Sequence, residues 1–170
     1  MILEVAYSQR KNFLPRILFD YRPSHGRPPQ DWQQRLPKGF TVERIDAAIA
    51  AQLQSDLVEA GIAPWFDTVW GSIERFLDGG FGFVVMHEGA IISNCRSWSI
   101  TEGVAAIQVS TRSRYRQSGL ATLVCCAFIE RCAECGFTPE YSCDAENVAS
   151  AALAEKLGFV RVGLVEETNA

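Results

Sequence analysis

A basic loop that runs into a helix is the segment of this sequence best suited to hold an anion. Val109 ends a strand-like stretch, arginines follow at positions 112, 114 and 116, and an apolar helical pattern opens at Ser118 and Gly119. The first N–H groups of a helix have no partner within it, and the helix dipole adds positive charge there, so such an end can bind phosphate. Guanidinium groups also pair with phosphate oxygens. The segment therefore predicts a phosphate site; a solvated basic turn before a helix is the alternative.

A second polar segment precedes the last helical pattern of the chain. Asn147 stands where it can cap that helix, and Gly158 stands where the helix should end. Taken alone, this segment indicates an ordinary core helix.

Together, the two segments resemble the GNAT N-acetyltransferase superfamily. The superfamily's acetyl-CoA signature is similar to Arg116-x-x-Gly119-x-Ala121, and its C-terminal motif is similar to Asn147-x-x-Ser150 followed by Lys156-Leu157-Gly158-Phe159. Three further segments resemble a subgroup related to zwittermicin A resistance acetyltransferases. They are Trp70-Gly71-Ser72 with Phe76, Gly80-Phe81-Gly82-Phe83, and Leu153-Ala154-Glu155-Lys156. The resemblance covers about residues 40–165.

This resemblance implies an acetyl-CoA site. The amides of residues 116–121 would hold the pyrophosphate, residues 109–111 would pair with the pantetheine arm, and Asn147 would hydrogen-bond that arm. The thioester would lie where the parallel strands 104–109 and 141–143 splay apart. The implied cofactor-binding residues are Val109, Ser110, Thr111, Arg116, Gln117, Ser118, Gly119, Leu120, Ala121 and Asn147.

Two proton-handling groups that are common in this superfamily are missing. The usual glutamate of the fourth strand corresponds to Ala106, and the usual tyrosine of the last helix corresponds to Ala154. An alkylammonium with a pKa of ~10 is protonated at neutral pH, so some proton path is required. The candidates for that path are Tyr141, Cys143 and Ser150, with Glu102 and Asp144 as further alternatives.

The six cysteines raise the question of a metal site. Cys132-x-x-Cys135 has the spacing of a ligand pair, and Cys125 and Cys126 lie on the same predicted helix. A closed tetrahedral site needs a second ligand pair, and the sequence offers none. Buried, reduced thiols are the better interpretation.

The elements that must position these segments follow from hydrophobic periodicity. Strands are expected at 40–45, 81–86, 90–98, 104–109, 141–143 and 159–164, and helices after Asp46, from Pro64 to the Gly79-Gly80 pair, from Leu120 to Gly136, and at 147–157. Tight turns at 88–89 and 102–103 predict an antiparallel meander, and the strand–helix–strand unit around the basic loop predicts a right-handed parallel crossover. The expected fold is a GNAT-like α/β (α+β) mixed, mostly antiparallel sheet with one parallel βαβ crossover and helices on both faces.

Length and composition set outer limits. The 170 residues, 48 % of them apolar, suffice for one domain, which we expect at 39–170 as an acetyl-CoA-binding domain after an irregular, proline-rich arm at 1–38. The net charge of −4 does not fit a protein whose whole surface is basic and binds nucleic acid. No apolar run approaches the roughly 18 residues of a membrane helix. Residues 1–5 lack the pattern of a secretory signal, so we expect a cytoplasmic protein.

The predicted function is an N-acetyltransferase that moves an acetyl group from acetyl-CoA, as co-substrate, to a primary amine of a small molecule. The resemblance points to an antibiotic or an amino metabolite as the acceptor. A CoA-binding module without transfer activity and a protein N-acetyltransferase are the alternatives. No nucleic-acid or membrane partner is expected, and a homodimer stays open.

Overall fold

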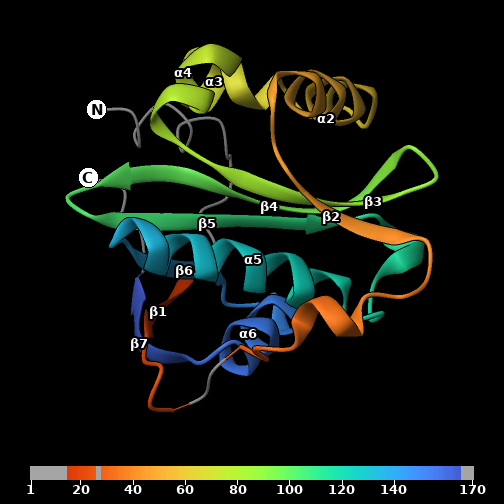
Figure 1. Cartoon of the computed structure of the whole chain (residues 1–170). Helices are drawn as coiled ribbons and strands as arrows, with labels where there is room; N and C mark the ends of the chain where they lie inside the picture. Colours follow the sequence, from red (N-terminus) through yellow and green to blue (C-terminus); the bar gives the residue numbers. More distant parts are fainter. Residues whose placement is uncertain (1–14, 26–27, 166–170) are drawn as a thin grey trace.

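A twisted seven-stranded sheet organises the chain (Figure 1). The computed structural model describes residues 15–25 and 28–165. In spatial order the strands are β2 (Phe40–Arg44), β3 (Gly82–His87), β4 (Ala90–Thr101), β5 (Val104–Thr111), β6 (Thr138–Asp144), β1 (Arg16–Tyr21) and β7 (Phe159–Val165). Neighbouring strands are antiparallel except β5 and β6, which are parallel. The predicted fold class is therefore confirmed.

Helices cover both faces of the β2–β5 part of the sheet (Figure 1). One face carries α2 (Ala47–Glu59), α3 (Trp65–Trp70) and α4 (Ile73–Gly79). The other face carries α5 (Leu120–Cys135), and α6 (Val148–Lys156) lies beside it. Two short 3₁₀ helices complete the set: η1 (Trp32–Arg35) and η2 (Ser113–Tyr115). The protein thus has two apolar cores, one on each side of the sheet.

The predicted parallel crossover is present. β5 leads into α5, which is buried along most of its length and returns the chain to β6 beside β5. The two strands pair only from Val104–Thr138 to Ala106–Glu140, so they part well before their carboxyl ends. This parting creates the cleft that is described below.

The N-terminal segment differs from the expected irregular arm. Residues 16–21 form β1, which inserts between β6 and β7, so that the sheet draws on residues from both sides of position 38. Ile17 and Phe19 point into the core, and this alternation is the signal of a half-buried strand. The expectation of an arm is wrong for this stretch, and residues 1–14 lie outside the described residues.

The helix expected from Pro64 to the Gly79-Gly80 pair is two helices. Gly71, with φ of +85°, ends α3 in a left-handed conformation that side chains other than glycine rarely adopt. The Ser72 hydroxyl then accepts the Arg75 N–H and starts α4. The apolar spacing continues across the break because both helices pack on the same core.

Candidate active site

A cleft of about 870 Å³ opens where β5 and β6 part, bordered by the first turn of α5 and by α6. Nine of the ten residues predicted to bind the cofactor line it. The exception is Leu120, the first residue of α5, whose side chain is buried in the core so that only its backbone can take part. Ser113, Tyr115 and Lys156 also line the cleft, although sequence reasoning did not assign them to the site.

The loop before α5 has the backbone geometry of an anion nest. Gln117 and Gly119 both have positive φ, +59° and +82°, a left-handed conformation typical of the turns whose N–H groups form anion-binding nests. In the described part of the chain no side chain caps the helix at Gly119, so the first N–H groups of α5 remain available to a ligand. The Ser118 hydroxyl donates to the carbonyl of Tyr115 and holds the loop closed.

The three arginines of the loop do not act together. Arg112 turns away: its Nε donates to the carbonyl of Ile91 at 2.6 Å, and its Nη2 lies 2.9 Å from a carboxylate oxygen of Asp56 on α2. The expectation that Arg112 stands beside the amides of the helix start is wrong, because it pairs with Asp56, a carboxylate far away in the sequence but adjacent in the fold. Arg114 stacks on the ring of Tyr115 at 4.9 Å. Arg116 lines the cleft and, with Lys156, supplies positive charge there.

The far wall of the cleft begins at Asn147. Its Oδ1 accepts the N–H of Ser150 at 3.1 Å, so the side chain caps α6 and its position is fixed. This cap brings Ser150 to the wall of the cleft, where it is partly exposed.

The three main candidates for the proton path lie together. The hydroxyls of Tyr141 and Ser150 are 2.8 Å apart, and Cys143 is close enough to Ser150 for that hydroxyl to oppose the rise in the pKa of its thiol. Burial raises the pKa of Tyr141 well above its usual value, against the opposing effect of the Ser150 hydrogen bond. Burial also raises the pKa of Cys143. Both groups are therefore protonated at neutral pH, and Ser150 is the member of the set that borders the cleft together with Tyr141.

The two further alternatives lie elsewhere. Glu102 is exposed at the tip of the β4–β5 turn, at the end of β5 remote from the basic loop. Asp144 is engaged by Arg16, whose Nη1 lies 2.8 Å from its Oδ1. Ala154 is fully buried, so nothing at that position reaches the cleft.

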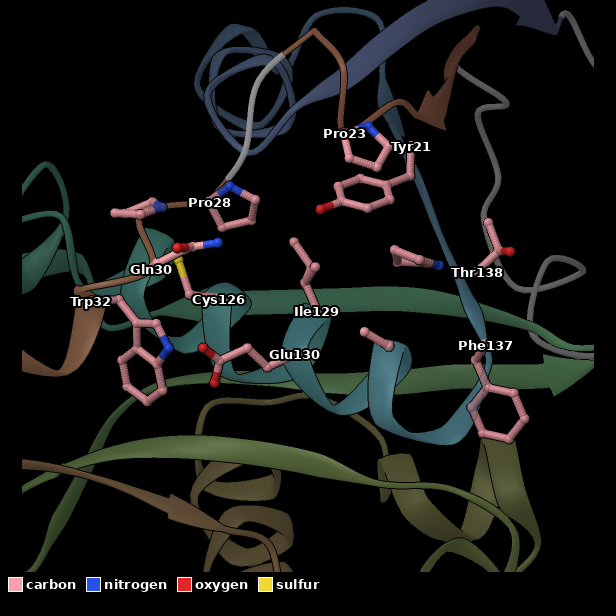
Figure 2. A pocket seen from close by; sticks show the side chains of 13 residues that line it. Tyr21, Pro23, Pro28, Gln30, Trp32, Cys126, Ile129, Glu130, Phe137 and Thr138 are labelled. Carbon is pink, nitrogen blue, oxygen red and sulfur yellow. The ribbon is translucent and has the colours of Figure 1, made fainter.

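A second cavity, of about 520 Å³, lies on the outer side of α5 (Figure 2). Tyr21, Pro23 and Pro28 of the proline-rich segment face Cys126 and Ile129 of the helix across it. None of the predicted site residues lines this cavity. The prolines here cover the core; they do not form part of the cleft.

Neither a cluster of metal-binding side chains nor a membrane-spanning helix occurs among the described residues. Within the described ranges no group of three or more His, Cys, Asp or Glu side chains could hold a metal ion. Five cysteines are buried, whereas Cys135 is exposed, so the interpretation as buried thiols is wrong for Cys135. None of the described helices is both long and apolar enough to span a bilayer.

Comparison with known proteins identifies the family. A model of the GNAT acetyltransferase family matches residues 1–164. The chain belongs to this family. Its members use acetyl-CoA as co-substrate, which agrees with an anion nest at the start of α5.

The chain is similar to longer proteins. It is 34 % identical over 161 residues to the uncharacterized N-acetyltransferase YdfB of Bacillus subtilis (strain 168), covering 95 % of this chain and 58 % of that protein. It is 28 % identical to a GCN5-related N-acetyltransferase-like protein from Streptococcus suis 89/1591, with a TM-score of 0.73, covering 96 % of this chain and 64 % of that one. The chain therefore spans about three fifths of the length of these relatives.

A more distant similarity extends to the fold alone. An aminoglycoside acetyltransferase from an uncultured soil metagenomic sample, solved in complex with sisomicin, is 16 % identical with a TM-score of 0.60. The alignment covers 78 % of this chain and 96 % of that one.

Proposed function

We propose that the chain binds acetyl-CoA in the cleft between β5 and β6 and transfers the acetyl group to a primary amine of a small molecule. The observation that carries the proposal is the coincidence of two features in one cleft: an uncapped helix N-terminus with a positive-φ nest, and a strand that loses its partner beside it. Acetyl-CoA supplies the acetyl group as a thioester.

Each part of the cleft suits one part of that molecule. The amides of residues 117–121 and the charges of Arg116 and Lys156 suit the pyrophosphate. Beyond Ala106, β5 no longer pairs with β6, so its backbone groups on that side can pair with the amides of a pantetheine arm, as an added strand would. This use of the free edge explains why Val109, Ser110 and Thr111 belong to the proposed site.

Ser150 is the proposed proton relay. The alkylammonium first releases one proton to solvent, which frees the lone pair that attacks the acetyl carbonyl. The attacking nitrogen then loses a second proton and the leaving sulfur gains one, so a relay between them passes this proton without any net change. A hydroxyl can accept and donate at the same time. Ser150 borders the cleft and is held by Tyr141, whose raised pKa keeps its own proton in place. Cys143 is a buried neighbour whose raised pKa keeps its thiol protonated.

A second candidate function is CoA binding without transfer. It is favoured by Ala106 and Ala154, which offer no group for proton transfer. Acetylation of protein amines is a weaker alternative, because no feature of the described residues supports it. A cytoplasmic location, an acceptor like that of the zwittermicin A resistance subgroup and a homodimer remain proposals from the sequence.

The experiment that separates these functions is an amine panel with acetyl-CoA, in which the release of free thiol is followed. The panel includes amino acids, simple alkylamines and an aminoglycoside, because one structural neighbour holds sisomicin. Release above the hydrolysis rate with at least one amine supports acetyl transfer. Tight CoA binding without release for any amine supports the second function.

A further inference from the structure

Arg96 is a buried cation that the proposed chemistry does not use. It lies on β4, is 2 % exposed, and its guanidinium carbon sits 4.0 Å from the ring centre of Trp65. Its Nη1 donates to Oδ1 of Asn94, but its Nε is buried and has no hydrogen-bond partner in the part of the chain that the structure describes. None of the ion pairs among the described residues involves Arg96.

A cation in this setting is costly. Removing a charge from water without a counter-charge destabilises a fold. Burial lowers the pKa of Arg96 to about 9, so the group still carries its charge at neutral pH. The fold also makes room for it, since a Cβ at Gly82, across on β3, would lie 2.7 Å from the Cβ of Arg96. A retained and accommodated charge of this kind points to an anion that arrives with a ligand.

The position of Arg96 places that anion beside the proposed thioester. Arg96 pairs with Gln108 of β5, just beyond Ala106, where β5 and β6 begin to part. It lies on the face of the sheet that carries α3, opposite α5. Gln108 and Trp98, its neighbours across and along the sheet, are partly exposed, whereas Arg96 itself is buried beneath them.

A hydrogen-bond chain joins Arg96 to the proposed cofactor strand. Asn94, which accepts from Arg96, donates its Nδ2 to the hydroxyl of Ser110 at 2.9 Å. Ser110 lines the cleft. The cation and the cleft are therefore fixed relative to each other.

We propose that Arg96 binds a carboxylate of the acceptor, so that the substrate is an amine that also carries a carboxylate. This inference rests on the proposed acetyl transfer and names its substrate class. A guanidinium binds a carboxylate through two parallel hydrogen bonds, and the orphaned Nε supplies one of these donors. The indoles of Trp65 and Trp98, with ring centres 6.0 Å apart, offer an apolar wall for the carbon skeleton between the two groups. A polycationic amine is disfavoured there, because it would bring further positive charge against Arg96.

The test compares each amino acid of a panel with its own carboxamide, which keeps the amine and loses the negative charge. For the wild-type chain we expect kcat/KM for the best amino acid to exceed that for its carboxamide by roughly 10-fold or more. This ratio is what the loss of a charge-assisted hydrogen bond produces. In Arg96→Met this ratio should fall to near one, and in Arg96→Lys it should be intermediate. Arg75→Met, which removes an exposed arginine from α4 on the same face, is the matched control and should keep the wild-type ratio.

Two further readouts keep the outcomes distinct. A melting temperature of Arg96→Met at or above that of the wild type shows that the variant folds, as expected when an unpaired buried charge is replaced by an apolar side chain. Calorimetric titration with 3-phenylpropionate, a carboxylate without an amine, should show binding to the wild type and at least a roughly 10-fold loss of affinity in Arg96→Met.

Equal rates for amino acids and carboxamides, an unchanged ratio in Arg96→Met, or a preference for an aminoglycoside would overturn the inference. Absence of transfer to every amine would instead refute the proposed function, and the titration would still decide whether Arg96 binds a carboxylate.

Discussion

Replacing Gly119 by alanine separates backbone strain from loss of the proposed phosphate site. Gly119 has φ of +82°, and a Cβ there would meet no atom of the described chain within 4 Å. Gly119→Ala therefore costs only the left-handed backbone penalty, roughly 1–2 kcal/mol. In a chain of this size, each kcal/mol lowers the melting temperature by roughly 2–4 °C.

The same methyl group changes ligand binding for a different reason. It points into the space at the N-terminus of α5 and disturbs the nest formed with Gln117. Loss of one hydrogen bond to a charged phosphate costs roughly 1.5–3 kcal/mol, so we expect acetyl-CoA to bind roughly 10- to 150-fold more weakly.

Gly103 provides the matched control. It has φ of +78°, its Cβ position is equally open, and it lies at the opposite end of β5 from the nest. Gly103→Ala should lose the same stability and keep the wild-type affinity for acetyl-CoA when both are measured by thermal unfolding and calorimetry. If the two variants bind acetyl-CoA equally well, the phosphate does not lie at the start of α5 and the reasoning is refuted.

Three other predictions concern the cleft and the thiols. Arg116→Ala should weaken binding of CoA more than binding of a pantetheine fragment without the pyrophosphate; equal losses in calorimetry would mean that this exposed arginine does not contact phosphate. Ser150→Ala should lower kcat roughly 100-fold or more, and adding Tyr141→Phe should lower it no further, because both act through one hydrogen bond; additive losses in steady-state rates would contradict a shared relay. Burial raises the pKa of Cys126 and of Cys132 to about 12, so at pH 8 both remain thiols and only exposed Cys135 should react quickly with a thiol reagent. Rapid labelling that persists in Cys135→Ser would contradict this picture.

Local signals in the sequence were sufficient for most elements. Asp46 caps α2 through its carboxylate, which accepts the Ile49 N–H at 2.8 Å, and Gly136 ends α5 as predicted. β1 was missed because its partners, β6 and β7, lie more than a hundred residues away in the chain. A short strand beside several prolines shows no local pattern strong enough to reveal such long-range pairing.

In the candidate site too, features that depend on neighbouring residues could be predicted, whereas contacts between distant parts of the sequence could not. Most residues that line the cleft could be predicted to lie together, because the strand, the loop and the helix start are consecutive in the chain; that they bind the cofactor stays a proposal. The contact of Arg112 with Asp56 could not, since it joins elements 56 residues apart. Arg96 was missed although a signal exists: an arginine and an asparagine stand two residues apart in the middle of a long strand whose other polar residues are only serine and threonine. The sequence shows that arginine, and only the fold shows that it is buried and joined through Asn94 to Ser110 of the cleft.

Calorimetric titration of the chain with acetyl-CoA and with desulfo-CoA tests the central claim most directly. If the affinity lies in the nest at the start of α5, both compounds bind to the wild type, neither binds to Gly119→Glu, and both bind to the control Gly103→Glu. Absence of binding to the wild type, or wild-type affinity in Gly119→Glu, would contradict the account.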